Sequence, residues 1–157
     1  MFTTVEDFLK TWSHESAQTA RVMAALTDDS LEQRVAEGYR SLGELAWHVV
    51  VSQLEIAGKT DLEYGAPSIR DPVPQRAAEI HSAYVDAAKA LGGAVERQWN
   101  DETLEVTDEL YGRVWPRGLT LAVVLYHEIH HRGQMTVLMR QAGLKVPGVY
   151  GPSADEE

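Results

Sequence analysis

Apolar residues recur at intervals of three and four in four long stretches of the chain, a spacing typical of amphipathic helices. These stretches cover roughly residues 4–26, 41–58, 74–99 and 119–142. In the third stretch the inward-facing positions are Ala77, Ile80, Tyr84, Ala87, Ala88, Leu91 and Val95. The pattern therefore predicts four helices and no convincing strand.

Residues near the ends of these stretches indicate where the helices begin and stop. Ser41 precedes an apolar run and Glu44 follows three residues later, the spacing of a capping box, so the second helix should begin there. Thr3 and Glu6 have the same spacing at the start of the first helix. Gly143 is typical of the residue that follows a helix C-terminus and marks the end of the fourth helix.

The segments outside the helices allow little regular structure. Residues 64–74, YGAPSIRDPVP, contain three prolines and a glycine, which excludes a regular element. The polar stretch 100–118 allows either a short hairpin or nothing regular. The tail 145–157, KVPGVYGPSADEE, is rich in proline and glycine, and we expect it to be extended.

Four helices without convincing strands predict an all-α fold, an antiparallel four-helix bundle. We expect one domain over residues 1–157, ending in the extended tail. A chain of 157 residues buries roughly 70% of its unfolded surface when it folds, which is enough for a substantial core. Binding sites in such bundles are built in the core from side chains on facing helices.

Composition narrows the chemistry and the partners. Cysteine is absent, which excludes disulfides, thiolate catalysis and cysteine-based zinc sites. The formal net charge of -10 opposes contact with a phosphate backbone, so we expect no nucleic-acid partner. No apolar run approaches the roughly 20 residues of a membrane span, and the N-terminal sequence lacks the features of a signal peptide. We therefore expect a cytoplasmic protein without a membrane partner.

The most informative stretch is HEIHHRGQ at 127–134, which holds three histidines and a glutamate within its first five residues. On a regular helix His127 and His131 lie about 40° apart and one turn apart, so both imidazoles can reach one ion. Glu128 and His130 lie about 80° to either side of that pair and can only flank the site. The spacing thus favours His127 and His131 as metal ligands.

Two imidazoles alone bind a metal weakly, so a third ligand must come from elsewhere in the chain. His48 is the candidate because it lies in the apolar run LAWHVVVS of the second helix, where a polar side chain needs a partner. His14 and His81 have polar neighbours and are expected at the surface. The alternatives are a core histidine bonded to a carbonyl at position 48 and a coincidental pair on the fourth helix.

Two other metal sites share parts of this pattern. Residues 127–131 match the H-E-x-x-H motif of zinc proteases, in which Glu128 would be the general base. Such enzymes usually take a third ligand from further along the chain, and here no histidine or glutamate follows until Glu156. A di-iron bundle needs a second Glu-x-x-His pair, which this sequence lacks. Both of these interpretations are disfavoured.

Three features together resemble the DinB-like (DNA-damage-inducible) family: His48 in the second helix, the H-x3-H-R-G-Q run from His127, and the sequence AGLKVPGVYGPS at 142–153. The resemblance covers nearly the whole chain. It implies a four-helix bundle, often dimeric, that holds a divalent metal ion through three histidines, here His48, His127 and His131. We accordingly expect a homodimer, a small-molecule substrate and a divalent ion, with zinc or nickel favoured over iron or manganese.

Relatives of this fold include bacillithiol S-transferases and mycothiol-dependent maleylpyruvate isomerases, which use low-molecular-weight thiols. Three histidine ligands leave one coordination position open, which is typical of catalytic rather than structural sites. The first hypothesis is therefore a metal-dependent, S-transferase-like enzyme that acts through a thiol cofactor. The alternatives are a hydrolase that uses metal-bound water and a non-catalytic metal-binding stress-response bundle. The thiol-binding residues are not identifiable, and Glu128 is the sole, weak catalytic candidate.

Five further residues near the histidines carry expectations. Gln134 is placed to hydrogen-bond a ligand histidine or to line the cavity, and Arg132 should face outward or pair with an acidic side chain. Gly133 costs the helix about 1 kcal/mol relative to alanine, which a close approach from another helix or slack near the site would explain. Glu44 is interpreted as a cap residue and Glu55 as a solvated charge, and the alternative for each is a hydrogen-bond acceptor or base near the metal.

Overall fold

A computed structural model of the protein describes residues 1–156. Four long helices dominate it, accompanied by two short 3-10 helices and one two-stranded hairpin. The elements in chain order are α1 (Val5–Ala24), η1 (Asp28–Ser30), α2 (Leu42–Ala57), α3 (Ala77–Gln98), η2 (Glu102–Glu105), β1 (Thr107–Leu110), β2 (Arg113–Pro116) and α4 (Arg117–Gln141).

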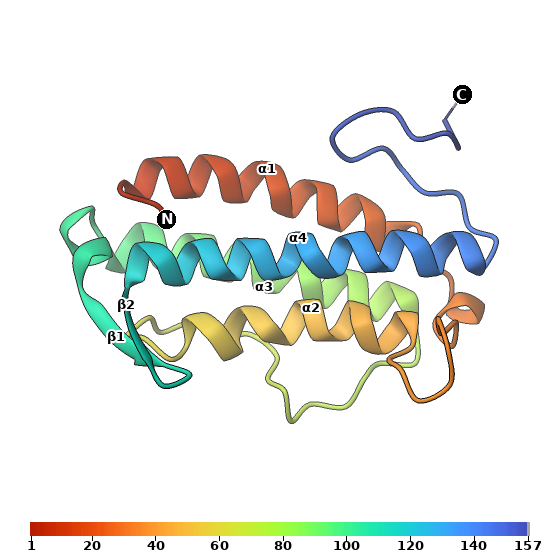
Figure 1. Ribbon diagram of the computed structural model, residues 1–157, viewed down its shortest axis with the longest axis horizontal. Coiled ribbons are helices and arrows are strands. Elements are labelled where there is room, and N and C mark those ends of the chain that lie inside the picture. The colour runs from red at the N-terminus through yellow and green to blue at the C-terminus, as the bar shows by residue number, and fades with distance from the viewer. Residues whose placement is uncertain (157) are drawn as a thin grey trace.

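The four helices lie side by side around a common apolar core (Figure 1). Helix α1 packs mainly against α3 and α4, and α2 packs against the same two helices, so α1 and α2 occupy opposite corners of the bundle. The largest fully buried apolar side chains come from all four helices and from β1: Phe8, Met23, Leu42, Ile80, Tyr84, Leu91, Leu110, Leu121, Met135 and Met139. The predicted all-α, four-helix bundle is confirmed.

The predicted N-cap residue is correct at the start of α2 and wrong by one residue at the start of α1. At α2, the Ser41 hydroxyl accepts a hydrogen bond from the Glu44 backbone N–H at 3.2 Å, and the Glu44 carboxylate accepts one from the Ser41 N–H at 2.7 Å. The capping box and the role of Glu44 in it are confirmed. At α1, Thr3 is not the N-cap: the Thr4 hydroxyl accepts from the Asp7 N–H at 3.1 Å. Each of these hydroxyls satisfies an amide that has no partner within its helix.

Helix α3 begins later than its apolar pattern suggested, at Ala77 instead of Pro74. The Ala77 N–H donates to a carboxylate oxygen of Asp28, which lies in η1, at 2.8 Å. This bond from a distant residue caps a helix whose own N-cap, Arg76, makes no side-chain cap bond. A cap supplied by tertiary contact leaves no local signal in the sequence.

The polar stretch before α4 forms the short hairpin that the sequence left as one of two options. Strands β1 and β2 pair antiparallel, with Thr107 opposite Pro116 and Leu110 opposite Arg113. The chain reverses at Tyr111 and Gly112, which have φ of 53° and 72°. A positive φ is easy for glycine and uncommon for tyrosine, so the conformation at Tyr111 is set by the turn and not by the preference of that residue.

The segment after α4 is extended, as expected. Gly143 follows the helix with φ of 76°, the left-handed conformation that ends many helices. Beyond it the tail lies over the end of the bundle near α1 and α4 (Figure 1), and its Tyr150 hydroxyl accepts a hydrogen bond from Arg132. Among residues 1–156, no helix is long and apolar enough to cross a membrane.

Candidate metal centre

The packing of α2 against α4 brings three histidines together. Nε2 of His48 lies 3.2 Å from Nε2 of His127, which lies 3.2 Å from Nε2 of His131. One nitrogen from each ring can be chosen so that all three lie within 4.8 Å of one another. The one-turn spacing on α4 and the partner on α2 thus converge as the sequence predicted.

These separations fit a metal ion. In a tetrahedral shell with metal–nitrogen bonds of about 2.0–2.1 Å, neighbouring donor atoms are about 3.3 Å apart. The two nearest donor pairs in the cluster are both at 3.2 Å. Three imidazoles without a fourth protein ligand match the ligand count of catalytic zinc sites. The group could therefore hold a divalent ion with one position left open.

A hydrogen bond on α4 fixes the orientation of one ring. Nδ1 of His131 lies 2.7 Å from the Gln134 side-chain oxygen, which can only accept, so the imidazole proton resides on Nδ1. The Nε2 lone pair of His131 is then directed at the other two histidines. Gln134 thereby performs the role expected of the residue behind a metal-binding histidine. Nδ1 of His127, in contrast, is buried with no hydrogen-bond partner among the described residues.

The surroundings keep the three rings uncharged at neutral pH. Burial lowers the pKa of His48 and of His127 to about 4, and the positive charge of Arg40 and the neighbouring imidazoles act in the same direction. Burial also lowers the pKa of His131, although the bond to Gln134 partly opposes this. Neutral imidazole is the form that binds metal.

The other histidines stand apart from this cluster. His130 is exposed, and although its ring centre is 4.9 Å from that of His131, it does not belong to the ligand group. His14 is exposed and His81 is partly exposed. Their positions agree with the expectation that they are surface residues.

Glu128, the weak catalytic candidate, points into the core. Its carboxylate accepts hydrogen bonds from the hydroxyls of Tyr84 at 2.7 Å and Thr19 at 2.8 Å, and the Gln53 amide lies at 3.5 Å. Burial raises the pKa of Glu128 to about 7, against the opposing effect of these hydroxyls and of Arg132. The side chain is 2% exposed, so it joins α1, α2 and α3 to α4 and is not presented to a substrate.

Arg132 lies in the same buried layer and does not face outward. Its guanidinium pairs with the Glu15 carboxylate at 2.7 Å and donates to the Thr19 hydroxyl at 3.1 Å and the Tyr150 hydroxyl at 2.6 Å. Of the two placements considered for this arginine, the acidic partner is the one observed. Gly133, beside it, has open space where a Cβ would be, so no neighbouring helix approaches it closely.

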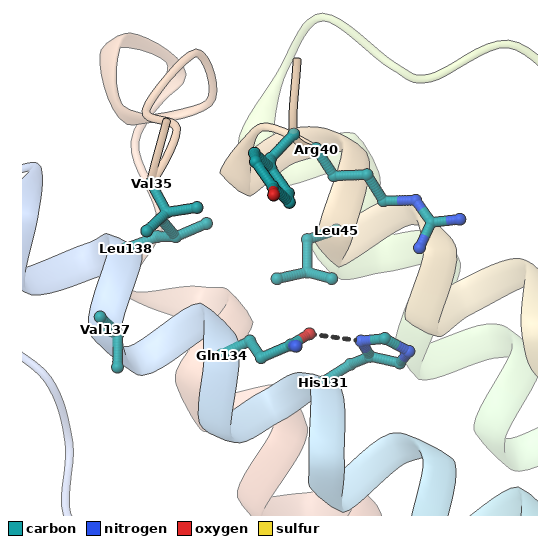
Figure 2. A pocket seen from close by; sticks show the side chains of 8 residues that line it. Val35, Arg40, Leu45, His131, Gln134, Val137 and Leu138 are labelled. Atoms are coloured by element: carbon teal, nitrogen blue, oxygen red, sulfur yellow. Dashed lines mark hydrogen bonds between the residues drawn. The ribbon is translucent and has the colours of Figure 1, made fainter. Parts of the chain in front are cut away.

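Two cavities reach the histidine cluster, one at His131 and the other at His48. The His131 cavity, of about 360 Å³, is lined by Val35, Tyr39, Arg40, Leu45, His131, Gln134, Val137 and Leu138 (Figure 2). The His48 cavity, of about 400 Å³, is lined by Arg40, Glu44, Trp47, His48, Val51, Glu55, Ile69 and Val73. Arg40 is common to both. Sequence reasoning missed Arg40 because it lies in the irregular segment before α2, where no periodicity marks it.

The whole chain, residues 1–157, matches the family model described as "DinB family". The chain belongs to the DinB family. YrdA of Bacillus subtilis (strain 168) is 44% identical over 156 residues, covering 99% of this chain and 93% of that protein. The resemblance seen in the histidine motifs is therefore confirmed.

Solved structures agree with this membership of the DinB family. A DinB-like protein from Bacillus cereus ATCC 10987 has a TM-score of 0.92 and 41% identity, over 96% of this chain and 100% of that chain. The DinB-like protein YjoA of Bacillus subtilis has a TM-score of 0.72 and 19% identity, over 91% of this chain and 96% of that chain. At such low identity, the second likeness shows the shared fold alone.

Proposed function

We propose that His48, His127 and His131 hold one divalent ion through Nε2, and that the protein is a metal-dependent, S-transferase-like enzyme that acts through a thiol cofactor. The observation that carries the proposal is the convergence of three neutral imidazoles, with two of the Nε2–Nε2 separations at 3.2 Å, beside cavities that reach His131 and His48. Zinc or nickel suits such a nitrogen ligand set best, with iron or manganese as alternatives.

The open coordination position gives the site its chemistry. A bound divalent ion would act as a Lewis acid there and lower the pKa of a coordinated thiol or water. The protein contributes ligands held on two packed helices, and Gln134 keeps the His131 ring in the ligating orientation. The two cavities supply room for two reactants beside the same ligand group.

The surroundings favour a thiol over water as the nucleophile. Hydrolases that use metal-bound water commonly add a carboxylate base, as Glu128 would be in the zinc-protease motif. Here Glu128 is buried and accepts hydrogen bonds from Tyr84 and Thr19. A thiol has a pKa of about 8.5 and needs only a modest shift to ionise, so it requires no separate base. The hydrolase therefore stands as the alternative.

One pair of assays separates the candidates. Protein loaded with zinc or nickel is mixed with cysteine, glutathione, bacillithiol or mycothiol and with 1-chloro-2,4-dinitrobenzene. Transfer forms a carbon–sulfur bond, releases chloride and gives the thiol proton to solvent, which absorbance follows above the uncatalysed rate. We expect turnover that requires both metal and thiol and is absent in His131→Ala, with His130→Ala as the matched control.

The second assay offers p-nitrophenyl acetate without thiol. Metal-dependent ester hydrolysis in the absence of thiol turnover would favour the hydrolase. Full metal content with neither activity, but with loss of thermal stability on chelation, would favour the non-catalytic metal-binding stress-response bundle. The homodimer expected from the family resemblance stays a prediction that sedimentation velocity would test.

A further inference from the structure

The charge at the histidine cluster is incompletely balanced. All three proposed ligands are neutral imidazoles, so a divalent ion would keep its full positive charge. No carboxylate belongs to the ligand group found among residues 1–156. Positive charge at a partly enclosed site is costly unless an anion neutralises it. The balancing negative charge must therefore come from the protein nearby or from bound ligands, and the thiolate of the proposed cofactor would supply only one unit of it.

Two acidic side chains close to the proposed ligands, Glu44 and Glu128, have other partners. The Glu44 carboxylate is bound by Arg34 at 2.7 Å and by the Ser41 N–H at 2.7 Å in the cap of α2. Glu128 is directed into the core, where Tyr84 and Thr19 donate to it. These carboxylates cannot serve the cluster without giving up the bonds that stabilise the helix start and the core.

Arg40 adds further positive charge at the same place. It lines both cavities, so it lies beside His131 in one and beside His48 in the other. It makes no ion pair or side-chain hydrogen bond within residues 1–156, whereas Arg34, Arg117 and Arg132 are each paired with a carboxylate. An unpaired guanidinium offers up to five N–H donors in a planar arrangement suited to a carboxylate.

The two cavities differ in the groups that surround Arg40. The His48 cavity also contains Glu44 and Glu55, which would repel an anion. The His131 cavity contains no carboxylate, and most of its wall is apolar: Val35, Leu45, Val137 and Leu138. In Figure 2 the Arg40 side chain extends past Leu45, and its guanidinium lies on the same side of this cavity as the His131 ring. An anion is therefore favoured in the His131 cavity.

We propose that the substrate is a small amphipathic carboxylate, whose acid group pairs with Arg40 and whose apolar part lies in the His131 cavity. This inference rests on the proposed function, since it names the substrate class of that same site. The cavity of about 360 Å³ is large enough for a short aliphatic chain or a single aromatic ring. The bound molecule would lie against His131, one of the three residues that would hold the ion.

Binding measurements with a matched pair of probes test the proposal. Titration calorimetry compares 4-phenylbutanoate with 4-phenylbutanol, which share the apolar part and differ in the acid group. In zinc-loaded full-length protein, we expect the carboxylate to bind more tightly. Arg40→Gln should reduce that preference about tenfold, the loss of one charge-assisted hydrogen bond. Arg40→Lys should retain part of it, because the charge stays while the planar geometry is lost.

Two control variants separate the effect of the Arg40 charge from general effects of charge and of apolar contact. Arg97→Gln removes the same charge from an exposed position on α3 and should leave the preference unchanged. Val137→Ser should weaken both probes alike, by about threefold, because it replaces the two methyl groups of a partly exposed cavity residue with a hydroxyl. Val137 is 53% exposed, so its substitution should not disturb folding.

An unchanged preference in Arg40→Gln, with zinc content and melting temperature intact, would overturn the proposal, because the acid group would then be held elsewhere. Equal binding of the two probes to the unmodified protein would also overturn it. The same titrations on metal-free protein distinguish this outcome from failure of the proposed function. If the protein held no zinc, the metal site would be refuted, while the dependence of carboxylate binding on Arg40 would still be measured.

Discussion

Gln134 accepts a hydrogen bond from Nδ1 of His131 at 2.7 Å, one turn further along α4. The bond sets the tautomer of the ring and directs its Nε2 toward His48 and His127. Partners of this kind usually change metal affinity by 10–100-fold when they are removed. The glutamine is therefore expected to matter for metal binding although it belongs to no ligand group.

Gln134→Leu should lower zinc affinity by about 10–100-fold, whereas Gln134→Glu, which keeps an oxygen acceptor, should retain most of it. Competition with a chelating dye would measure both values. Gln141→Leu, at an exposed position near the end of the same helix, is the control. Affinity unaltered in Gln134→Leu would show that the ring is oriented without this bond.

His131→Ala should remove most of the bound metal, and His130→Ala should remove little. The first ring contributes a nitrogen to the cluster, while the second is exposed and outside the ligand group. Elemental analysis of the two variants, purified without an affinity tag, gives the metal content per chain. Equal losses in both would contradict the assignment of ligands.

The metal-free protein should lose stability as the pH falls from about 6.5 toward 4. Folding lowers the pKa of His48 and His127 from the ordinary histidine value of 6.5 to about 4, chiefly through burial. In that window the unfolded chain binds more protons than the folded chain, so a lower pH favours unfolding. Urea titrations at several pH values measure the free energy of unfolding.

The double variant His48→Gln/His127→Gln should flatten this pH dependence, and His14→Gln, at an exposed position, should preserve it. Metal occupancy should fall over the same range, since protons compete for the ligand nitrogens. Occupancy that stays constant down to pH 4 would argue against histidine ligation.

Arg132→Ala should destabilise the fold by about 3–5 kcal/mol, because it leaves the Glu15 carboxylate buried without its partner. The guanidinium is 3% exposed and lies 2.7 Å from that carboxylate. Arg140→Ala, which breaks an exposed pair with Asp155, should cost less than about 1 kcal/mol. Denaturant unfolding of the two variants gives the loss in free energy of unfolding for each. Similar losses would show that the buried Arg132–Glu15 pair contributes no more to stability than an exposed pair.

Glu128→Gln should leave metal content and turnover per bound metal close to those of the unmodified protein. Its carboxylate serves Tyr84 and Thr19, and the glutamine oxygen can accept in its place. Thiol-transfer rates normalised to metal content provide the measurement. Full metal content with abolished turnover would restore Glu128 as a catalytic base.

Local patterns were sufficient to predict the helices and the histidine cluster. Apolar residues that recur every 3.6 positions mark the buried face of a helix in any bundle, and two histidines four residues apart must share a face. His48 could be proposed because a polar ring in an apolar run needs a partner. The Ser41–Glu44 cap is encoded within four residues and was located correctly.

Features that depend on tertiary contacts could not be found in this way. Asp28 caps α3 from 49 positions away, and Arg132 reaches Glu15 across 117 positions. The position of Glu128 on its helix predicted only that it could flank the metal site. It could not predict that Thr19 and Tyr84, on other helices, would donate hydrogen bonds to its carboxylate. Arg40 lies in an irregular segment, so only the folded chain shows that it stands over the histidines.

The tail is fastened to the bundle by Tyr150, whose hydroxyl bonds both Arg132 and Glu15. Arg132 directly follows His131, so this fastening lies one residue from the cluster. A recombinant version cut short before Tyr150 would lose this hydroxyl and open the Arg132–Glu15 ion pair to water. Affinity handles are therefore better attached at the other end of the polypeptide.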